Sequence, residues 1–142
     1  MTRPLLYLLD TNICIFTMNH RPEGVGRRIE QATAAGHRLG ISSVTLHELW
    51  YGVRRSSRPE SNAERLSTLV RTLDVFDFGL DAAEAAAGIR ATLAGSGAPI
   101  GPYDVLIAGH ALSLDAPIVT NNLGEFARVP GLRCEDWTRE EG

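Results

Sequence analysis

The chain has 142 residues, of which 44% are hydrophobic and 22% charged, and its formal net charge is −3. This length suits one domain with a single core, and the hydrophobic content excludes a disordered chain. No apolar run approaches the ~18–20 residues of a membrane span, and the few apolar residues before Asp10 are too short for a secretory signal.

The first half of the chain alternates short apolar runs with amphipathic stretches. The run 5–9 is wholly apolar and ends at Asp10, a pattern typical of a strand buried on both faces of a parallel sheet. Asp10 or Thr11 is expected to cap the next helix, Pro22 to begin another, and Ser43 to cap a third. We expect strands over 5–9 and 39–42, and helices over 13–18, 22–35, 44–55 and 59–73.

Glycine and proline divide the second half in the same way. Gly95-Ser96-Gly97 ends an alanine-rich helix, and Gly101-Pro102 begins another. We expect strands over 75–78, 117–120 and, at an edge, 132–134, with helices over 81–94 and 103–114 and a short one ending near 129. Alternating strands and helices predict a single α/β domain over 1–142, with its core at about 4–137 and a central, mainly parallel sheet flanked by helices.

Acidic side chains follow the carboxyl ends of the predicted strands. Asp10 closes the first strand, Glu48 lies in the second turn of the helix after the second strand, and Asp104 lies in the first turn of a later helix. Because parallel strands end at one edge of a sheet, we expect the three carboxylates to converge there. Local alternatives are that Asp10 is only a helix cap, that Asp104 only complements a positive helix end, and that Glu48 is solvated.

Three carboxylates at ~5 Å would repel one another by roughly 10 kcal/mol at an effective dielectric constant of ~20. Such a site needs protonation or a cation, and hard oxygen ligands suit Mg²⁺ or Mn²⁺. Cys14 and Cys134 form no CxxC pair, and the four histidines show no zinc-binding spacing. A divalent ion among carboxylates commonly holds a phosphate and activates water.

All 14 basic residues are arginine, and the absence of lysine excludes P-loop and Schiff-base mechanisms. It also counts against a small-molecule phosphohydrolase of the haloacid-dehalogenase type. Arg54, Arg55 and Arg58 form the densest basic cluster, and we predict that they contact backbone phosphates of a polynucleotide. A solvated helix end is the alternative interpretation of this cluster. The two distant cysteines favour a reducing, cytoplasmic location.

Four segments, in order, resemble the PIN-domain ribonucleases, and among them the VapC toxins. The segments are Leu8–Asn12, Thr45–Val53, Gly101–Ala111 and Val119–Phe126. The stretches 10–17, 41–46 and 119–137 are similar to the VapC branch that cleaves initiator tRNA. The resemblance implies a PIN-like, Rossmann-like fold.

Under this resemblance, Asp10, Glu48 and Asp104 are the catalytic and metal-binding acids of an Mg²⁺-dependent endoribonuclease, with Mn²⁺ as a substitute. Many PIN domains carry a fourth aspartate where this chain has Asn122, which leaves a second metal ion open. The resemblance also implies supporting polar residues, namely Asn12, Thr120, Asn121 and Asn122.

The implied substrate is RNA, in particular a tRNA anticodon stem-loop, and the implied partner is a VapB-type antitoxin bound to a VapC homodimer. Trp50 and Tyr51 could line the antitoxin groove or could belong to the core. The competing hypothesis is a non-catalytic PIN-like module that binds RNA or protein.

Overall fold

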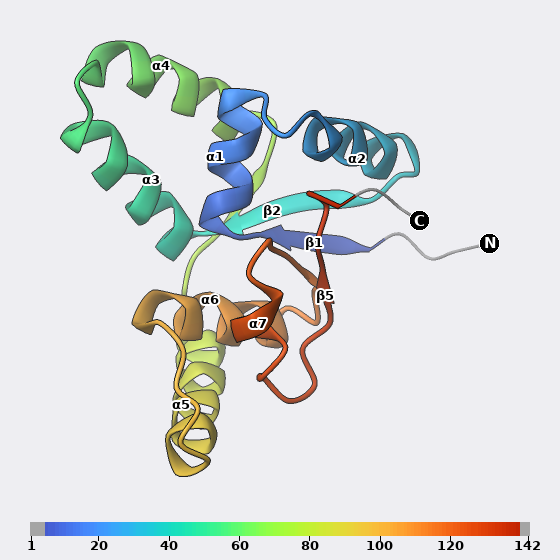
Figure 1. Ribbon diagram of the computed structural model, residues 1–142, viewed down its shortest axis with the longest axis vertical. Coiled ribbons are helices and arrows are strands. Elements are labelled where there is room, and N and C mark those ends of the chain that lie inside the picture. The colour runs from blue at the N-terminus through green and yellow to red at the C-terminus, as the bar shows by residue number, and fades with distance from the viewer. Residues whose placement is uncertain (1–4, 140–142) are drawn as a thin grey trace.

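The apolar runs of the sequence form the strands of one parallel sheet. The computed structural model describes residues 5–139, and within them five strands form the sheet (Figure 1). The strands are β1 (Leu6–Leu9), β2 (Arg38–Ser42), β3 (Asp74–Phe76), β4 (Ile118–Val119) and β5 (Cys134–Glu135). The helices are α1 (Thr11–Asn19), α2 (Glu23–Ala34), α3 (Ser43–Arg55), α4 (Pro59–Val70), α5 (Leu80–Gly95), α6 (Pro102–Ser113) and α7 (Leu123–Phe126).

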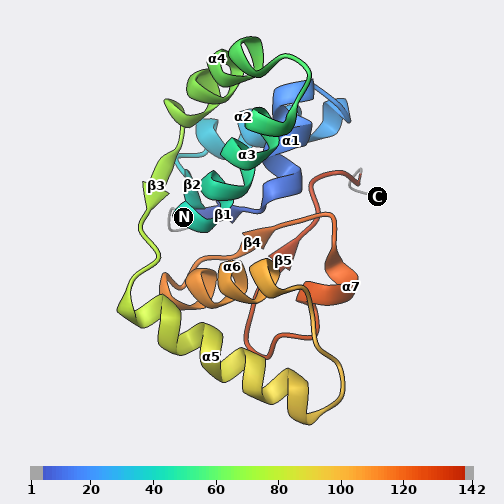
Figure 2. The ribbon, with the colours of Figure 1, turned by 90° about the vertical axis from the view of Figure 1, so that its left-hand side faces the viewer.

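The strand order is β3-β2-β1-β4-β5, and every neighbouring pair is parallel. The first strand is therefore central, with β2 pairing along one side of it and β4 along the other. Helices α1–α4 lie on one side of the sheet and α5–α7 on the other (Figure 1). This is the α/β domain with a parallel sheet that the alternating pattern predicts, and all carboxyl ends lie at one edge, which faces the viewer in Figure 2.

Side chains of the central strand alternate between two cores. Leu9 packs into the core under α1–α4, where Ile41 and Leu66 are fully buried. Leu8 points the other way, into the core that includes Ile107 and Phe126. Because both faces of the sheet are covered, β1 is a continuous apolar run rather than an alternating one.

Helices α5 and α6 cross at very short range. A Cβ atom added at Gly109 would lie 2.5 Å from the backbone nitrogen of Ala86. Only glycine therefore permits this approach of α6 to α5, which forms the outer layer below the sheet (Figure 2).

One capping prediction is wrong. The serine that caps α3 is Ser42, whose Oγ accepts from the backbone N–H of Val44 at 3.0 Å, and not Ser43. The Ser43 Oγ instead accepts from the backbone N–H of Phe78 at 3.0 Å and so fastens the segment after β3 to α3. Adjacent serines are equivalent in a sequence pattern, and the helix begins one residue earlier than predicted.

Ser42 also links the helices that carry two of the acids. Its Oγ lies 2.7 Å from Nδ1 of His110, a residue of α6, and both side chains are buried. Burial lowers the pKa of His110, so the imidazole is neutral at physiological pH. The residue that caps the start of α3 is thus hydrogen-bonded to the last turn of α6.

The remaining differences in element bounds are small. The helix expected to reach residue 73 ends at Val70, and the edge strand lies at Cys134–Glu135. No helix within residues 5–139 is both long enough and apolar enough to cross a membrane.

Candidate active site

Asp10 lies where β1 ends and α1 begins. Its side chain is 4% exposed, and its Oδ1 accepts from the backbone N–H of Ile13 at 2.9 Å. Burial raises the pKa of Asp10 to about 6, against the lowering effect of hydrogen bonds from Thr120 and Ile13; the negative charge of Glu48 adds to the rise. Asp10 is thus a helix cap, as expected, and also a poorly solvated carboxylate beside a second acid.

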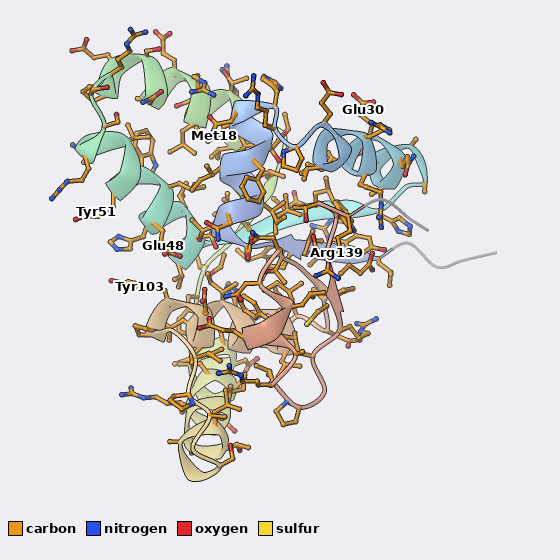
Figure 3. The ribbon with its side chains drawn as sticks, viewed as in Figure 1. Met18, Glu30, Glu48, Tyr51, Tyr103 and Arg139 are labelled. Atoms are coloured by element: carbon orange, nitrogen blue, oxygen red, sulfur yellow. The ribbon has the colours of Figure 1, made fainter. Side chains whose placement is uncertain are left out.

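Glu48 projects from the second turn of α3 toward the same edge of the sheet. Its Oε1 accepts from the hydroxyl of Thr11 at 2.7 Å, which ties α3 to the start of α1. Figure 3 shows Glu48 on α3 and Tyr103 on α6, on the same side of the molecule. Glu48 is half-buried, so a fully solvated side chain is excluded.

Asp104 lies in the first turn of α6. Its pKa is raised to about 7, first by burial, and then by a hydrogen bond with Glu125 and by the negative charges of Glu125, Asp10 and Glu48. A Cβ added at Gly101 would lie 3.2 Å from Oδ2 of Asp104, so the preceding turn leaves just enough room for this carboxylate. Electrostatic interactions therefore join all three predicted acids.

Glu125 is the acid that the sequence-based prediction missed. It lies in α7, and its side chain is hydrogen-bonded to Asp104. Nδ2 of Asn122 donates to Oε2 of Glu125 at 3.0 Å. The spacing Asn-x-x-Glu, which is typical of helix starts, was the available signal. A fourth carboxylate is thus present, three residues beyond the position where we looked for one.

The comparisons with known proteins identify the family. The family model "PIN domain" matches residues 7–132. The tRNA(fMet)-specific endonuclease VapC of Salmonella typhimurium is 47% identical over 133 residues, covering 94% of this chain and 98% of the relative. The chain belongs to the VapC family of PIN-domain proteins.

Solved structures agree with this assignment. The VapBC2 complex of Rickettsia felis, bound to a promoter DNA fragment, matches with a TM-score of 0.88 and 37% identity, covering 94% of this chain and 99% of that one. The DNA-bound VapBC complex of Salmonella typhimurium matches with a TM-score of 0.87 and 47% identity, covering 94% and 98%. The predicted PIN-like fold is therefore confirmed.

The polar residues predicted to support the VapC site lie around β4. Thr120 is buried, and its Oγ1 accepts from the backbone N–H of Asn122 at 2.9 Å. Nδ2 of Asn12 donates to Oδ1 of Asn121 at 3.5 Å, at the solvent-exposed rim. Thr120 thus contacts Asp10 and holds the turn, while Asn122 contacts Glu125.

The arginine cluster lies away from the acids of this VapC protein. Arg54 and Arg55 occupy the last turn of α3, about 10 Å along the helix axis from Glu48 at 1.5 Å per residue, and Arg58 precedes α4. The guanidinium of Arg55 lies 5.9 Å from the ring centroid of Tyr51. Their contact with RNA remains a prediction.

The chemistry of the site fits a hard divalent cation. Its donors are carboxylate oxygens, and the pKa values of Asp10 and Asp104 are raised mainly by burial and further by the negative charges of neighbouring carboxylates, which a bound cation would offset. Within residues 5–139, no three His, Cys, Asp or Glu side chains are already arranged as a complete set of metal ligands. If the site binds a metal ion, its carboxylates must therefore move closer together than they lie here.

Proposed function

We propose that this VapC protein is a metal-dependent endoribonuclease toxin that cleaves tRNA and is neutralised by a VapB-type antitoxin. The observation that carries the proposal is the group of four interacting carboxylates at the sheet edge, namely Asp10, Glu48, Asp104 and Glu125. The tRNA(fMet)-specific name of two relatives, which are 47% and 48% identical, supports the substrate.

The four acids have distinct parts in this proposal. Asp10 and Asp104 bind Mg²⁺, or Mn²⁺ in its place, and Glu48 and Glu125 orient water or bind a second ion. When bound, the ion would lower the pKa of a water molecule and neutralise charge on the phosphate. The Ile13 N–H fixes the Asp10 carboxylate, and Thr11 fixes that of Glu48.

The partner of this chain is proposed to be an antitoxin bound to a VapC homodimer, as the VapBC structures of relatives suggest. A pocket of about 230 Å³ beside Glu48 is lined by apolar and polar side chains of α1, α3 and α4, including Ile15, Met18 and Arg65. An antitoxin segment in this pocket would lie next to the acids. Trp50 packs against the core, and Tyr51 is 60% exposed. We further propose that the protein acts in the cytoplasm, where tRNA is present.

Cleavage of an initiator tRNA transcript tests the proposed activity. With Mg²⁺ we expect a defined cut with 5′-phosphate and 3′-hydroxyl ends, because water rather than a ribose hydroxyl attacks the phosphorus. The ends are determined by sequencing of the 5′-phosphorylated fragments, and EDTA serves as the control. Cuts that persist in EDTA, or that leave cyclic phosphates, would contradict the proposal.

Metal and pH are expected to act together on stability. The pKa of Asp10 is raised from 3.8 to about 6, so protonation favours the folded state, and stability is lost as the pH rises from about 4 to 6. The raised pKa of Asp104 extends this loss to about pH 7. At 1.36 kcal/mol per pKa unit, the Asp10 contribution is about 3 kcal/mol. Millimolar Mg²⁺ should therefore raise the melting temperature more at pH 8 than at pH 5, as differential scanning fluorimetry would record.

A Ca²⁺-free buffer series with EDTA provides the baseline for this measurement. Equal melting-temperature shifts at pH 5 and pH 8, or no shift at either, would show that the carboxylates do not share a cation.

A further inference from the structure

The exposed face of α3 carries a row of aromatic side chains that ends at an arginine. His47, Tyr51 and Arg55 are four residues apart, so they lie one above another on the helix surface. The Arg55 guanidinium lies 5.9 Å from the Tyr51 ring centroid. All three residues are exposed, and Tyr51 is 60% exposed.

The row continues across the mouth of the site onto α6. The ring of Tyr103 lies 5.9 Å from that of His47, at an interplanar angle of 47°. Tyr103 is 47% exposed. We call Tyr103, His47, Tyr51 and Arg55 the aromatic stripe; Figure 3 shows Tyr51 and Tyr103 on the same side of the molecule as Glu48.

The aromatic stripe begins beside the acids. Tyr103 immediately precedes Asp104, and His47 immediately precedes Glu48. Successive helix residues point about 100° apart, so each ring lies next to its acid rather than over it. A chain molecule whose phosphate is held at the acids would thus meet the rings directly on leaving the site.

We propose that the aromatic stripe binds unpaired nucleotides of the RNA on one side of the scissile phosphate, by stacking of bases on Tyr103, His47 and Tyr51. This inference rests on the proposed nuclease function and specifies how its substrate is held.

The charges of the protein favour this mode of binding. The carboxylates and the net charge of −3 repel an RNA backbone, whereas stacking on a ring does not require positive charge. Unpaired loop bases are the parts of RNA that splay out onto aromatic side chains and arginine planes. Arg55, at the far end, provides the one backbone contact that the stripe offers.

Fluorescence of 2-aminopurine tests the proposal. An anticodon stem-loop RNA with 2-aminopurine in its loop is titrated with the full chain in EDTA, so that no cleavage occurs. We expect the wild-type protein to quench the probe.

Tyr51→Ala should weaken binding about tenfold and reduce the quenching, while Tyr51→Phe should retain both, because phenylalanine keeps the stacking face. The dependence of affinity on salt should be unchanged in Tyr51→Ala, since no phosphate contact is lost.

Matched variants separate the stripe from general surface effects. Leu80 is 91% exposed at the start of α5, and Leu80→Ala should bind RNA as the wild type does. Arg55→Gln should lower the slope of log K against log salt by about 0.7, whereas Arg90→Gln, on exposed α5 surface, should not.

Equal affinity and quenching for wild type, Tyr51→Ala and Leu80→Ala would overturn the proposal. So would a Tyr51→Ala variant that binds RNA normally but no longer associates with its antitoxin or with a second copy of the chain, since the stripe would then be a protein contact. A wild-type protein that quenches the probe but does not cut RNA in Mg²⁺ would support the stripe and contradict the nuclease proposal. A protein that cuts without quenching would contradict the stripe alone.

Discussion

Asp10→Asn is expected to lower RNA cleavage by at least about a thousandfold, since the loss of a charged metal ligand removes several kcal/mol of transition-state stabilisation. The same substitution should stabilise the metal-free protein at pH 8 by about 2 kcal/mol, because it removes a buried carboxylate whose pKa is raised to about 6. The amide Oδ1 can still accept from the Ile13 N–H and keep the helix cap. Cleavage rates and denaturant unfolding measure the two effects.

This opposite change of activity and stability distinguishes a functional acid from a structural one. Asp115→Asn provides the control, because the Asp115 side chain is fully exposed and pairs with Arg133 on the surface. It should leave cleavage unchanged and alter stability by less than about 0.5 kcal/mol. Wild-type cleavage by Asp10→Asn would exclude this carboxylate from catalysis.

Gly109→Ala is expected to destabilise the fold by about 3 kcal/mol or more, because the new methyl group would lie 2.5–2.7 Å from the backbone and side chain of Ala86. To make room for this methyl group, α5 and α6 must move apart, and α6 carries Asp104. The melting temperature should fall by roughly 10 °C, and cleavage at low temperature should fall with it. Thermal unfolding followed by circular dichroism measures the effect.

Gly88→Ala is the matched control in the same pair of helices. A Cβ at Gly88 would have no atom within 4 Å, and the residue lies on the exposed face of α5. Alanine there should raise stability by up to about 1 kcal/mol, through its higher helix propensity. Similar melting temperatures for Gly109→Ala and Gly88→Ala would show that the helices do not cross as closely as described.

Much of the fold follows from the order of apolar runs. The run before Asp10 predicts β1 because the length, the absence of alternation and the abrupt polar end all agree. Pro59 and Pro102 mark helix starts correctly, since proline suits the first turn. The end of α4 at Val70 was less predictable, because Leu73 fits the helical spacing but lies outside the helix, where it packs against the same core.

The site was predictable only where an acid directly follows a strand or begins a helix. Asp10 and Asp104 meet that condition, and Glu48 was predicted from its place in the second turn of the helix that follows the second strand. Glu125 was missed because its approach to Asp104 depends on how the turn after β4 folds. That turn is held by the Thr120 hydroxyl and the Asn122 amide, and no periodicity in the sequence records either contact.

The buried hydrogen bond between Ser42 and His110 has a consequence for hybrids of VapC proteins. It spans 68 positions of the chain and joins the halves that supply Glu48 and Asp104. A hybrid toxin assembled from two parents with a junction between these halves inherits one partner from each parent. If the two parents differ at these positions, the hybrid would bury an unmatched polar group between the start of α3 and the last turn of α6. Such a hybrid should recover function when residues 42 and 110 are both replaced by those of the same parent.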